Sequence, residues 1–246
     1  MTLAYAASRG KKPIVVDLRA EGVPIPEASR RARKEECSVC GTVKRYFFNR
    51  IAADSGFTAV ATGHNLDDEA ARLLGNLLHW DDGHLSRQHP LLPESEGGLV
   101  RKVKPLWRVS EVETASYGFL KGIDFVTEEC PMSEDATSLV YKEALSLIEE
   151  AMPGTRRRFY QGFLKNRDVL KNFVENGKDK NGDVPELFNV HLGFPRKNQS
   201  PPDQDIDGRS RKCITCGAPT YAETCSYCRL KETVAKARRR TEKKSG

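Results

Sequence analysis

Apolar residues along the chain fall into short runs that alternate with stripes at helical spacing. The short runs have the length and composition of buried strands, and they lie at 13–18, 57–62, 99–103 and 123–127. Elsewhere apolar residues recur every three or four positions, which predicts helices over 38–53, 67–78, 110–122, 137–151 and 155–174. Strands that alternate with helices predict an α/β fold with a mainly parallel sheet covered on both faces.

The other segments look irregular, apart from residues 1–9, which fit the end of a helix. Two prolines predict a loop over 22–29, and a polar loop follows Trp80. A change to Asn, Gly, Asp, Pro and Lys predicts a linker over 176–212, with an apolar island at 187–194. We therefore expect a main domain over 1–155, a helix over 156–175, the linker, and a small C-terminal module over 213–246.

Charge and cysteine usage narrow the class of protein. The net charge is +6, and residues 229–246 account for all of it with eight Lys or Arg and two Glu. Such a tail is a solvated helix or a phosphate-binding arm. No apolar run approaches the length of a membrane span, and no signal-peptide pattern is seen, so we expect a cytoplasmic protein with no membrane partner. In that compartment seven cysteines indicate metal ligands or reactive thiols rather than disulfides.

The strongest single motif lies near the C-terminus. Cys213 and Cys216 form one CxxC pair, Cys225 and Cys228 form another, and eight residues separate the pairs. Four thiolates at this spacing predict a tetrahedral zinc ribbon, and the site is structural because protein fills every position. Two independent thiol pairs are the less favoured alternative.

Three further cysteines lie outside the ribbon, and they do not make a set of four. Cys37 and Cys40 share one face of the helix predicted over 38–53, and Cys130 follows the last predicted strand. Three thiolates suit either zinc with an open position or an iron-sulfur cubane with one iron left for another ligand. Proline directly after Cys130 is a pattern seen at iron-sulfur ligands. The alternative is that Cys130 is an ordinary buried cysteine and that Cys37 and Cys40 form a redox pair.

Charged residues accompany these cysteines. Lys44 lies on the same helix face as Cys37 and Cys40. The sequence from Gly63 to Asp68 (GHNLDD) joins a predicted strand to a helix, which is where ligands sit in α/β sheets. Here a carboxylate could position Mg-nucleotide, with Gly63 allowing close backbone approach. The competing interpretation is that Asp67 or Asp68 only caps the helix.

Several motifs in the right order resemble the tRNA 2-thiouridine synthetases of the TtuA type, iron-sulfur members of the PP-loop (adenine nucleotide alpha hydrolase) superfamily. The resemblance covers about 12–165 and 212–231. The stretches that carry it are CSVCGTVKRYFFNR, ATGHNLDDEA, LLGNLLHW, GGLVRKVKPL, EECPMSEDATS, PGTRRRFYQGFL and CITCGAPT with CSYCRL.

The resemblance implies a fold, a function and a set of site residues. The fold is a partial PP-loop ATPase, a Rossmann-like parallel sheet, with a C-terminal zinc ribbon. Cysteines matching Cys37, Cys40 and Cys130 would hold a [4Fe-4S] cluster, and Lys44 and Asp68 would act in catalysis. Gly63 would approach ATP, and we expect His64 and Asp67 to join it in binding the Mg-nucleotide.

The implied reaction is ATP-dependent adenylation of uridine O2 in tRNA, followed by sulfur transfer through the cluster. The family takes sulfur from a ubiquitin-like carrier protein with a C-terminal thiocarboxylate, and it is commonly homodimeric. Lys44 would neutralise phosphate or oxyanion charge, and Asp68 would hold Mg or move a proton at the uracil ring.

This sequence departs from the family in one respect. It contains neither the N-terminal zinc ribbon nor the SGGxDS phosphate loop of its relatives. We expect a truncated chain or a split protein whose first segment, with the phosphate loop, is a separate polypeptide; a degenerate paralogue is the third explanation. A non-catalytic, zinc-stabilised tRNA-binding or scaffold subunit is the alternative function.

The missing loop makes a prediction about this polypeptide alone. A pyrophosphate cradle needs successive backbone amides at a strand-helix junction, so we expect weak ATP binding or none. Calorimetry that gave a micromolar affinity would refute this.

Overall fold

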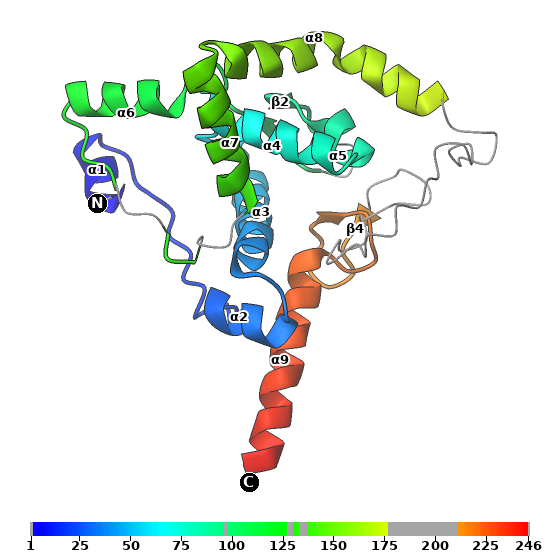
Figure 1. The fold of residues 1–246 in the computed structure, drawn as a ribbon. Helices are drawn as coiled ribbons and strands as arrows, with labels where there is room; N and C mark the ends of the chain where they lie inside the picture. Colours follow the sequence, from blue (N-terminus) through cyan, green and yellow to red (C-terminus); the bar gives the residue numbers. More distant parts are fainter. Residues whose placement is uncertain (1, 96–97, 127–129, 133–136, 177–210, 246) are drawn as a thin grey trace.

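The computed structural model describes residues 2–95, 98–126, 130–132, 137–176 and 211–245 (Figure 1). Its helices are α1 (Thr2–Ser8), α2 (Ile25–Ala32), α3 (Glu36–Asp54), α4 (Leu66–Leu78), α5 (Asp82–Arg87), α6 (Glu111–Leu120), α7 (Thr137–Ala151), α8 (Thr155–Asn176) and α9 (Ser226–Ser245). None of the helices in these ranges has both the length and the apolar character needed to cross a membrane. The linker predicted over 176–212 lies almost wholly outside the described residues, as does its apolar island.

The described strands form two small sheets. β1 (Ala59–Ala61) pairs in parallel with β3 (Arg101–Val103), and β3 pairs antiparallel with β2 (Leu91–Leu92), which gives the order β1-β3-β2. β4 (Arg211–Lys212) and β5 (Pro219–Thr220) form an antiparallel pair beside the C-terminal cysteines. The runs at 57–62 and 99–103 are therefore confirmed as strands that pair in parallel.

Two predicted strands are wrong within the described residues. Residues 13–18 form no strand, and Ile14 and Val15 are 62% and 69% exposed. Residues 123–126 are also unpaired, and Thr127 lies outside the described residues. An apolar run becomes a strand only where a neighbouring strand takes up its backbone donors and acceptors, and neither run has such a neighbour here. The observed sheet is mixed, not the mainly parallel sheet that was expected.

The predicted helices agree with the structure better than the predicted strands do. Each of the five predicted at helical spacing is present, as α3, α4, α6, α7 and α8, and the expected helix near the N-terminus is α1. The loop predicted over 22–29 is wrong, because α2 begins there at Ile25. Proline is tolerated in the first turn of a helix, where its missing N–H has no partner to lose. Helix α5 also occupies part of the expected polar loop.

The buried apolar residues form separate clusters around two sets of helices. Two clusters surround α4: one packs Leu73 against Tyr160 of α8, and the other packs Ala70 and Ala71 against Leu145 of α7. All of these residues are at most 4% exposed. A third cluster joins α2, α3 and the C-terminal module. It contains the following residues: Val23, Ile25, Ala28, Val39, Val43, Cys213, Cys225, Tyr227, Cys228, Leu230 and Val234. The cysteines of the predicted zinc ribbon are therefore part of a core shared with the first turns of α3.

Helices α4 and α7 approach closely at Gly75. A Cβ atom added there would lie 2.7 Å from the ring of Tyr141. We predict that Gly75→Ala destabilises the protein by about 1–3 kcal/mol, because the Tyr141 ring must shift in a packed interface. The matched control is Gly162→Ala in α8, where an added Cβ meets nothing within 4 Å. That variant should be neutral or stabilised by up to about 1 kcal/mol. Urea unfolding of both variants tests this, and equal midpoints would contradict it.

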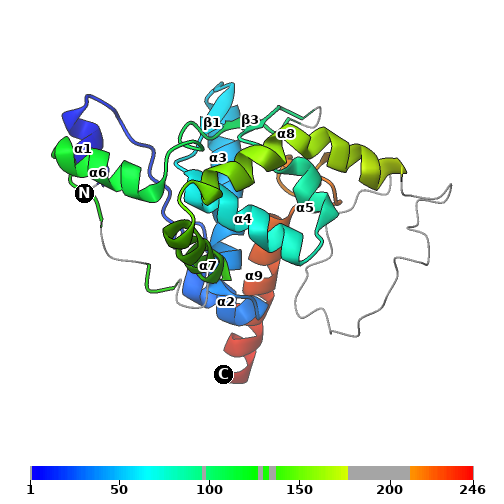
Figure 2. The same ribbon diagram turned by 45° about the horizontal axis from the view of Figure 1, so that its top comes forward.

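A cluster of charges joins α2 to α9, which lie against each other in both ribbon views (Figure 2). Glu27 accepts hydrogen bonds from Arg238 at 2.9 Å and 2.5 Å and from Arg31 at 2.7 Å. The Arg238 guanidinium is the main reason that the pKa of Glu27 falls from its ordinary 4.5 to about 2. The carboxylate therefore stabilises the fold most when it is charged.

We predict a pH-dependent cost for Glu27→Gln. A lowered pKa gives stability that is present above about pH 4.5 and is lost as the pH falls towards 2. At pH 7 the variant should therefore melt below the wild type, and the difference should shrink through this window. The control is Glu232→Gln, which removes an exposed pair with Lys236 and should change little. A difference that stays constant from pH 7 to pH 2 would contradict the assignment.

Candidate active site

The first turns of α3 present two cysteines and a lysine. Cys37 is exposed, and Cys40 is half-buried against the core that α3 shares with the C-terminal module. Lys44 follows one turn later, is exposed, and lines a cavity of about 440 Å³ together with apolar residues of α3, β1 and the 13–18 segment. Lys44 is the charged residue in a lining that is otherwise apolar.

The segment 130–132 lies against the start of α3. The thiol of Cys37 donates a hydrogen bond to the carbonyl oxygen of Met132 at 3.3 Å. Burial raises the pKa of the Cys37 thiol, the neighbouring Cys130 and Cys40 raise it further, and Lys44 opposes them. The structure thus brings together four of the residues that the sequence singled out, although Cys37 and Cys130 are 93 positions apart.

Within the described residues, the C-terminal cysteines form a group whose ligand atoms all lie within 4.8 Å of one another, as a single metal ion requires. Cys37, Cys40 and Cys130 are not part of such a group. Each thiolate of a cubane cluster binds a different iron, so an iron-sulfur cluster does not need its cysteines to converge on one ion.

The turn from β1 into α4 holds the second set of predicted residues. Asn65 is the N-cap of α4: its side chain accepts from the Asp68 N–H at 2.9 Å, and its own N–H donates to Asp68 at 3.1 Å. A Cβ atom added at Gly63 would meet nothing within 4 Å, so that backbone faces open space. His64 lies 2.8 Å from the Thr62 hydroxyl, and burial lowers the pKa of His64 against the pull of Asp68.

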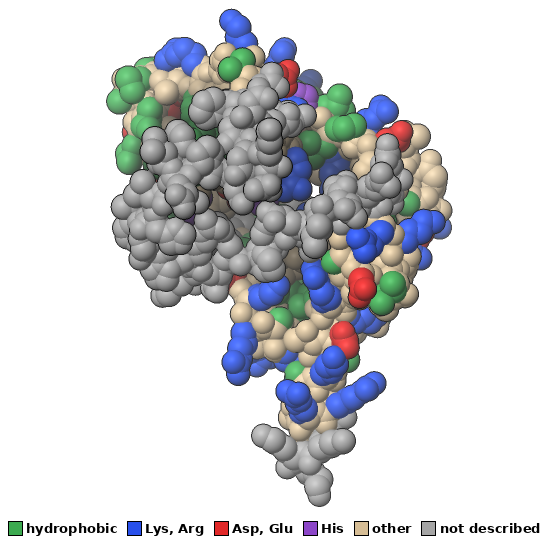
Figure 3. All heavy atoms as spheres, turned by 90° about the vertical axis from the view of Figure 1, so that its right-hand side faces the viewer, with side chains coloured by type: hydrophobic (Ala, Val, Ile, Leu, Met, Phe, Trp, Pro, Cys, Tyr) green, Lys and Arg blue, Asp and Glu red, His purple; other side chains and the backbone are tan. Residues whose placement is uncertain are grey.

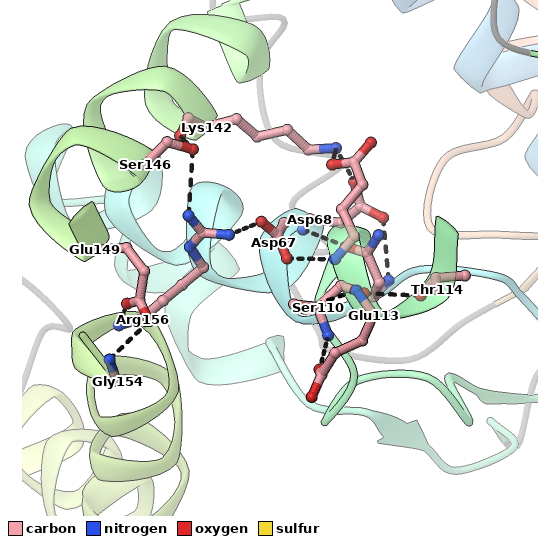
Figure 4. A network of polar contacts seen from close by, with 12 residues as sticks. Asp67, Asp68, Ser110, Glu113, Thr114, Lys142, Ser146, Glu149, Gly154 and Arg156 are labelled. Carbon is pink, nitrogen blue, oxygen red and sulfur yellow. Dashed lines mark hydrogen bonds and ion pairs between the residues drawn. The ribbon is translucent and has the colours of Figure 1, made fainter. Parts of the chain in front are cut away.

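The two aspartates have different surroundings (Figure 4). Both oxygens of Asp67 are engaged inside the protein: one pairs with Arg156, and the other accepts the Glu111 N–H at 2.8 Å. Asp67 is 7% exposed. Asp68 pairs with Lys142 at 2.8 Å, and its side chain is 30% exposed. In this structure Asp67 anchors α4 to α6 and α8, whereas Asp68 is the carboxylate that a ligand could reach.

The described contacts do not join the two predicted catalytic residues. The charge of Lys44 acts on the Cys37 thiol and lowers its pKa. Asp68 instead forms an ion pair with Lys142 of α7. Among the described residues, no hydrogen bond or ion pair links Lys44 to Asp68. The site therefore consists of a cysteine centre on α3 and an acidic helix start on α4.

Sequence reasoning missed the side chains that surround the acidic helix start. Lys142 of α7 also pairs with Glu111 at 3.0 Å. Deeper in the fold, Glu69 is fully buried and accepts from Lys104 at 2.7 Å and 2.8 Å and from the Tyr160 hydroxyl at 2.9 Å. A glutamate among the apolar positions of α4 is the one sequence signal of this network, since a buried carboxylate needs a partner.

The C-terminal cysteines fit a zinc ion. The sulfurs of Cys216 and Cys225 are 3.8 Å apart, and a tetrahedral ion with Zn–S bonds of about 2.3 Å places its ligands roughly 3.8 Å apart. Burial by itself would raise the pKa of Cys213, but N–H groups, first that of Cys225, lower it to about 6. Such donors stabilise the thiolate form that binds zinc.

Comparisons with known proteins give the same family name as the motifs. A tRNA-5-methyluridine(54) 2-sulfurtransferase of Thermus thermophilus is 42% identical over 235 residues, which are 95% of this chain and 63% of that relative. One from Thermotoga maritima is 40% identical over 220 residues, 89% of this chain and 62% of the relative. The chain thus spans about three fifths of the length of these relatives.

A solved structure shows the likeness of fold. The U34-tRNA thiolase NcsA from Methanococcus maripaludis, with its [4Fe-4S] cluster, aligns at a TM-score of 0.59 and 21% identity. The alignment covers 68% of this chain and 56% of that one. At this identity the likeness concerns the mixed α/β fold alone. No family model matches the sequence.

Proposed function

From the likeness to tRNA-5-methyluridine(54) 2-sulfurtransferases, we propose that the chain belongs to an enzyme that replaces O2 of a tRNA uridine with sulfur. The observation that carries the proposal is the meeting of Cys37, Cys40 and Cys130 beside Lys44. Two relatives with that name match 89% or more of this chain.

The three thiols fit a [4Fe-4S] cluster with one iron free of protein ligands. Two come from a single helix turn, and the third comes from a segment that contacts this turn. When bound, such a cluster would supply an iron that can hold the sulfur to be transferred. Lys44 follows on the same helix face, so its ammonium stabilises negative charge that develops on phosphate or on the uridine oxygen.

Asp68 is the proposed acidic group at the nucleotide. Its carboxylate lies in the first turn of α4, four residues after His64, where the helix dipole and the open backbone at Gly63 favour phosphate. There Asp68 would hold Mg or move a proton at the uracil ring. Asp67, which has internal partners for both oxygens, supports this turn. ATP and Mg binding by Gly63, His64 and Asp67 stays a prediction.

The C-terminal module has a structural role in this proposal. Its four buried or half-buried cysteines would hold zinc and complete the core beneath α3. The partners are tRNA and a ubiquitin-like sulfur carrier with a C-terminal thiocarboxylate. We further propose that the protein is a homodimer, as the resemblance implies, and that it acts in the cytoplasm, as the name of a yeast relative, cytoplasmic tRNA 2-thiolation protein 1, suggests.

The proposed activity is tested by anaerobic thiolation of tRNA with ATP, Mg and sulfide, with 2-thiolated nucleoside measured by mass spectrometry. Wild-type chain loaded with iron, and supplied with a polypeptide that carries the SGGxDS phosphate loop, should produce it, and Lys44→Met and Asp68→Asn should lower the rate by a factor of about 100 or more. Asp54→Asn, an exposed change at the other end of α3, is the matched control. Thionucleoside formation that is equal in all four proteins would contradict the roles of Lys44 and Asp68.

The alternative is a non-catalytic tRNA-binding or scaffold subunit. It predicts tRNA binding by a chain that holds its metal and yet forms no thionucleoside under any of these conditions. The exposed positions of Cys37 and Cys130 favour the enzyme, because a purely structural metal site is normally closed and buried.

A further inference from the structure

A group of basic side chains on α2 and α9 lies next to the cysteine centre. The two helices are joined by side-chain contacts: Glu27 pairs with Arg238, Arg31 donates to Thr241, and Glu21, just before α2, pairs with Lys231. The C-terminal end of α2 is therefore beside residues 238–241 of α9. We call the exposed cations at this place the α2–α9 basic surface, and its members are Arg30, Arg33, Lys34, Arg239 and Arg240.

We propose that the α2–α9 basic surface binds the phosphate backbone of the RNA substrate and presents the RNA to the cysteines of α3. This inference rests on the proposed function for the identity of the RNA, and on the structure for the place where it binds.

The first support is the absence of acidic partners for these cations in the described part of the chain. The acidic residues at this interface are already engaged, because Glu27 binds Arg31 and Arg238 while Glu21 faces Lys231. Within the described ranges, no member of the surface forms an ion pair. Cations held together without counter-charge repel one another and cost folding stability, and an external polyanion would relieve this repulsion. A merely solvated helix face needs no such concentration of one sign.

The second support is the kind of cation and its setting. Four of the five members are arginines, whose planar guanidinium groups match phosphate with paired hydrogen bonds. Figure 3 shows Lys and Arg side chains along the exposed length of α9, with fewer acidic ones between them. In the described part of the chain, α2 and α9 carry no exposed aromatic side chain, so this surface suits backbone contacts rather than base stacking. An RNA backbone is thus favoured over a single small anion.

The third support is the position relative to the candidate active site. Arg33 adopts the left-handed conformation that ends α2, with φ of 51°, and turns the chain into α3. Cys37 follows four residues later, so their Cα atoms are at most about 14 Å apart. RNA held at the end of α2 would therefore pass close to the cysteine centre.

The test removes four charges and leaves the Glu27 cluster intact. The variant carries Lys34→Gln, Arg239→Gln and Arg240→Gln, with Arg33→Asn because asparagine tolerates the left-handed conformation. Binding of a tRNA transcript to the full, metal-loaded chain is measured at several KCl concentrations. We expect the affinity to fall by about tenfold or more near 150 mM salt, and the salt slope to fall by up to about four.

The control is Lys121→Gln with Lys165→Gln, two exposed lysines on α6 and α8. This variant should bind tRNA as the wild type does. The four-charge variant should also melt at or above the wild-type temperature, which excludes unfolding as the cause of weaker binding. Equal tRNA affinity in the four-charge variant and the wild type would overturn the proposal. If binding to the sulfur-carrier protein fell instead, the surface would belong to that partner.

The result is separable from the proposed function. If the four-charge variant loses tRNA affinity while the wild type forms no thionucleoside, the binding surface is supported and the proposed activity is contradicted. If the four-charge variant thiolates tRNA and binds it as tightly as the wild type does, the proposed activity is supported and the binding surface is contradicted.

Discussion

Replacing Cys130 with serine is expected to remove the iron-sulfur centre while the fold survives. The anaerobically loaded wild type should hold about four irons per chain, and Cys130→Ser should hold few or none. Thionucleoside formation should fall by a factor of at least about 100, because the sulfur-holding group is lost. The reason is geometric: the segment 130–132 is the part of the described chain that meets Cys37 from outside α3.

Two controls make this result specific. Ser38→Ala changes an exposed residue between Cys37 and Cys40 and should keep its iron. The zinc content of Cys130→Ser should stay at about one per chain, since the C-terminal site is separate. A serine variant that retained about four irons would show that Cys130 is not a ligand.

The largest effect on stability is expected at the C-terminal cysteines. Cys213, Cys225 and Cys228 are buried in the same core as Val23 and Val39. We predict that Cys228→Ser, or removal of zinc by a chelator, lowers the unfolding free energy by several kcal/mol, because a structural zinc site contributes on the order of 10 kcal/mol to folding. Loss of the module also exposes the apolar face of α3.

Urea unfolding followed by circular dichroism measures this effect, since α9 contributes helix signal. Glu223→Gln, an exposed change in the loop between the two cysteine pairs, is the matched control and should leave the midpoint unchanged. The chelator should have no further effect on Cys228→Ser. An unfolding midpoint that neither the chelator nor the substitution changed would show that the module needs no metal.

Local signals in the sequence predicted local features well. The helix predicted from residue 110 is present as α6, which begins with a capping box of Ser110 and Glu113 with hydrogen bonds of 3.1 Å and 2.7 Å. The two CxxC pairs predicted a four-cysteine group, and their sulfurs meet. In each case the residues that interact are close in sequence, so spacing alone places them.

Features that depend on distant residues were not predictable. Asp67 looked like a cap or a nucleotide ligand, but its partner Arg156 is 89 positions away. The apolar run at 13–18 looked like a buried strand, but a strand forms only beside another strand. The packing of the C-terminal module against α2 and α3 also gave no sequence signal, because the charges that join them, Glu27 and Arg238, are 211 positions apart.

The most direct test of the central claim is the metal content and the electron paramagnetic resonance spectrum of the chain after anaerobic loading with iron and sulfide. We predict about four irons and one zinc per chain, with a reduced-cluster signal that disappears when Cys37, Cys40 and Cys130 are all serine. Zinc at both sites without iron, or a cluster signal that persists in the triple variant, would contradict the claim that these three cysteines hold a catalytic iron-sulfur centre.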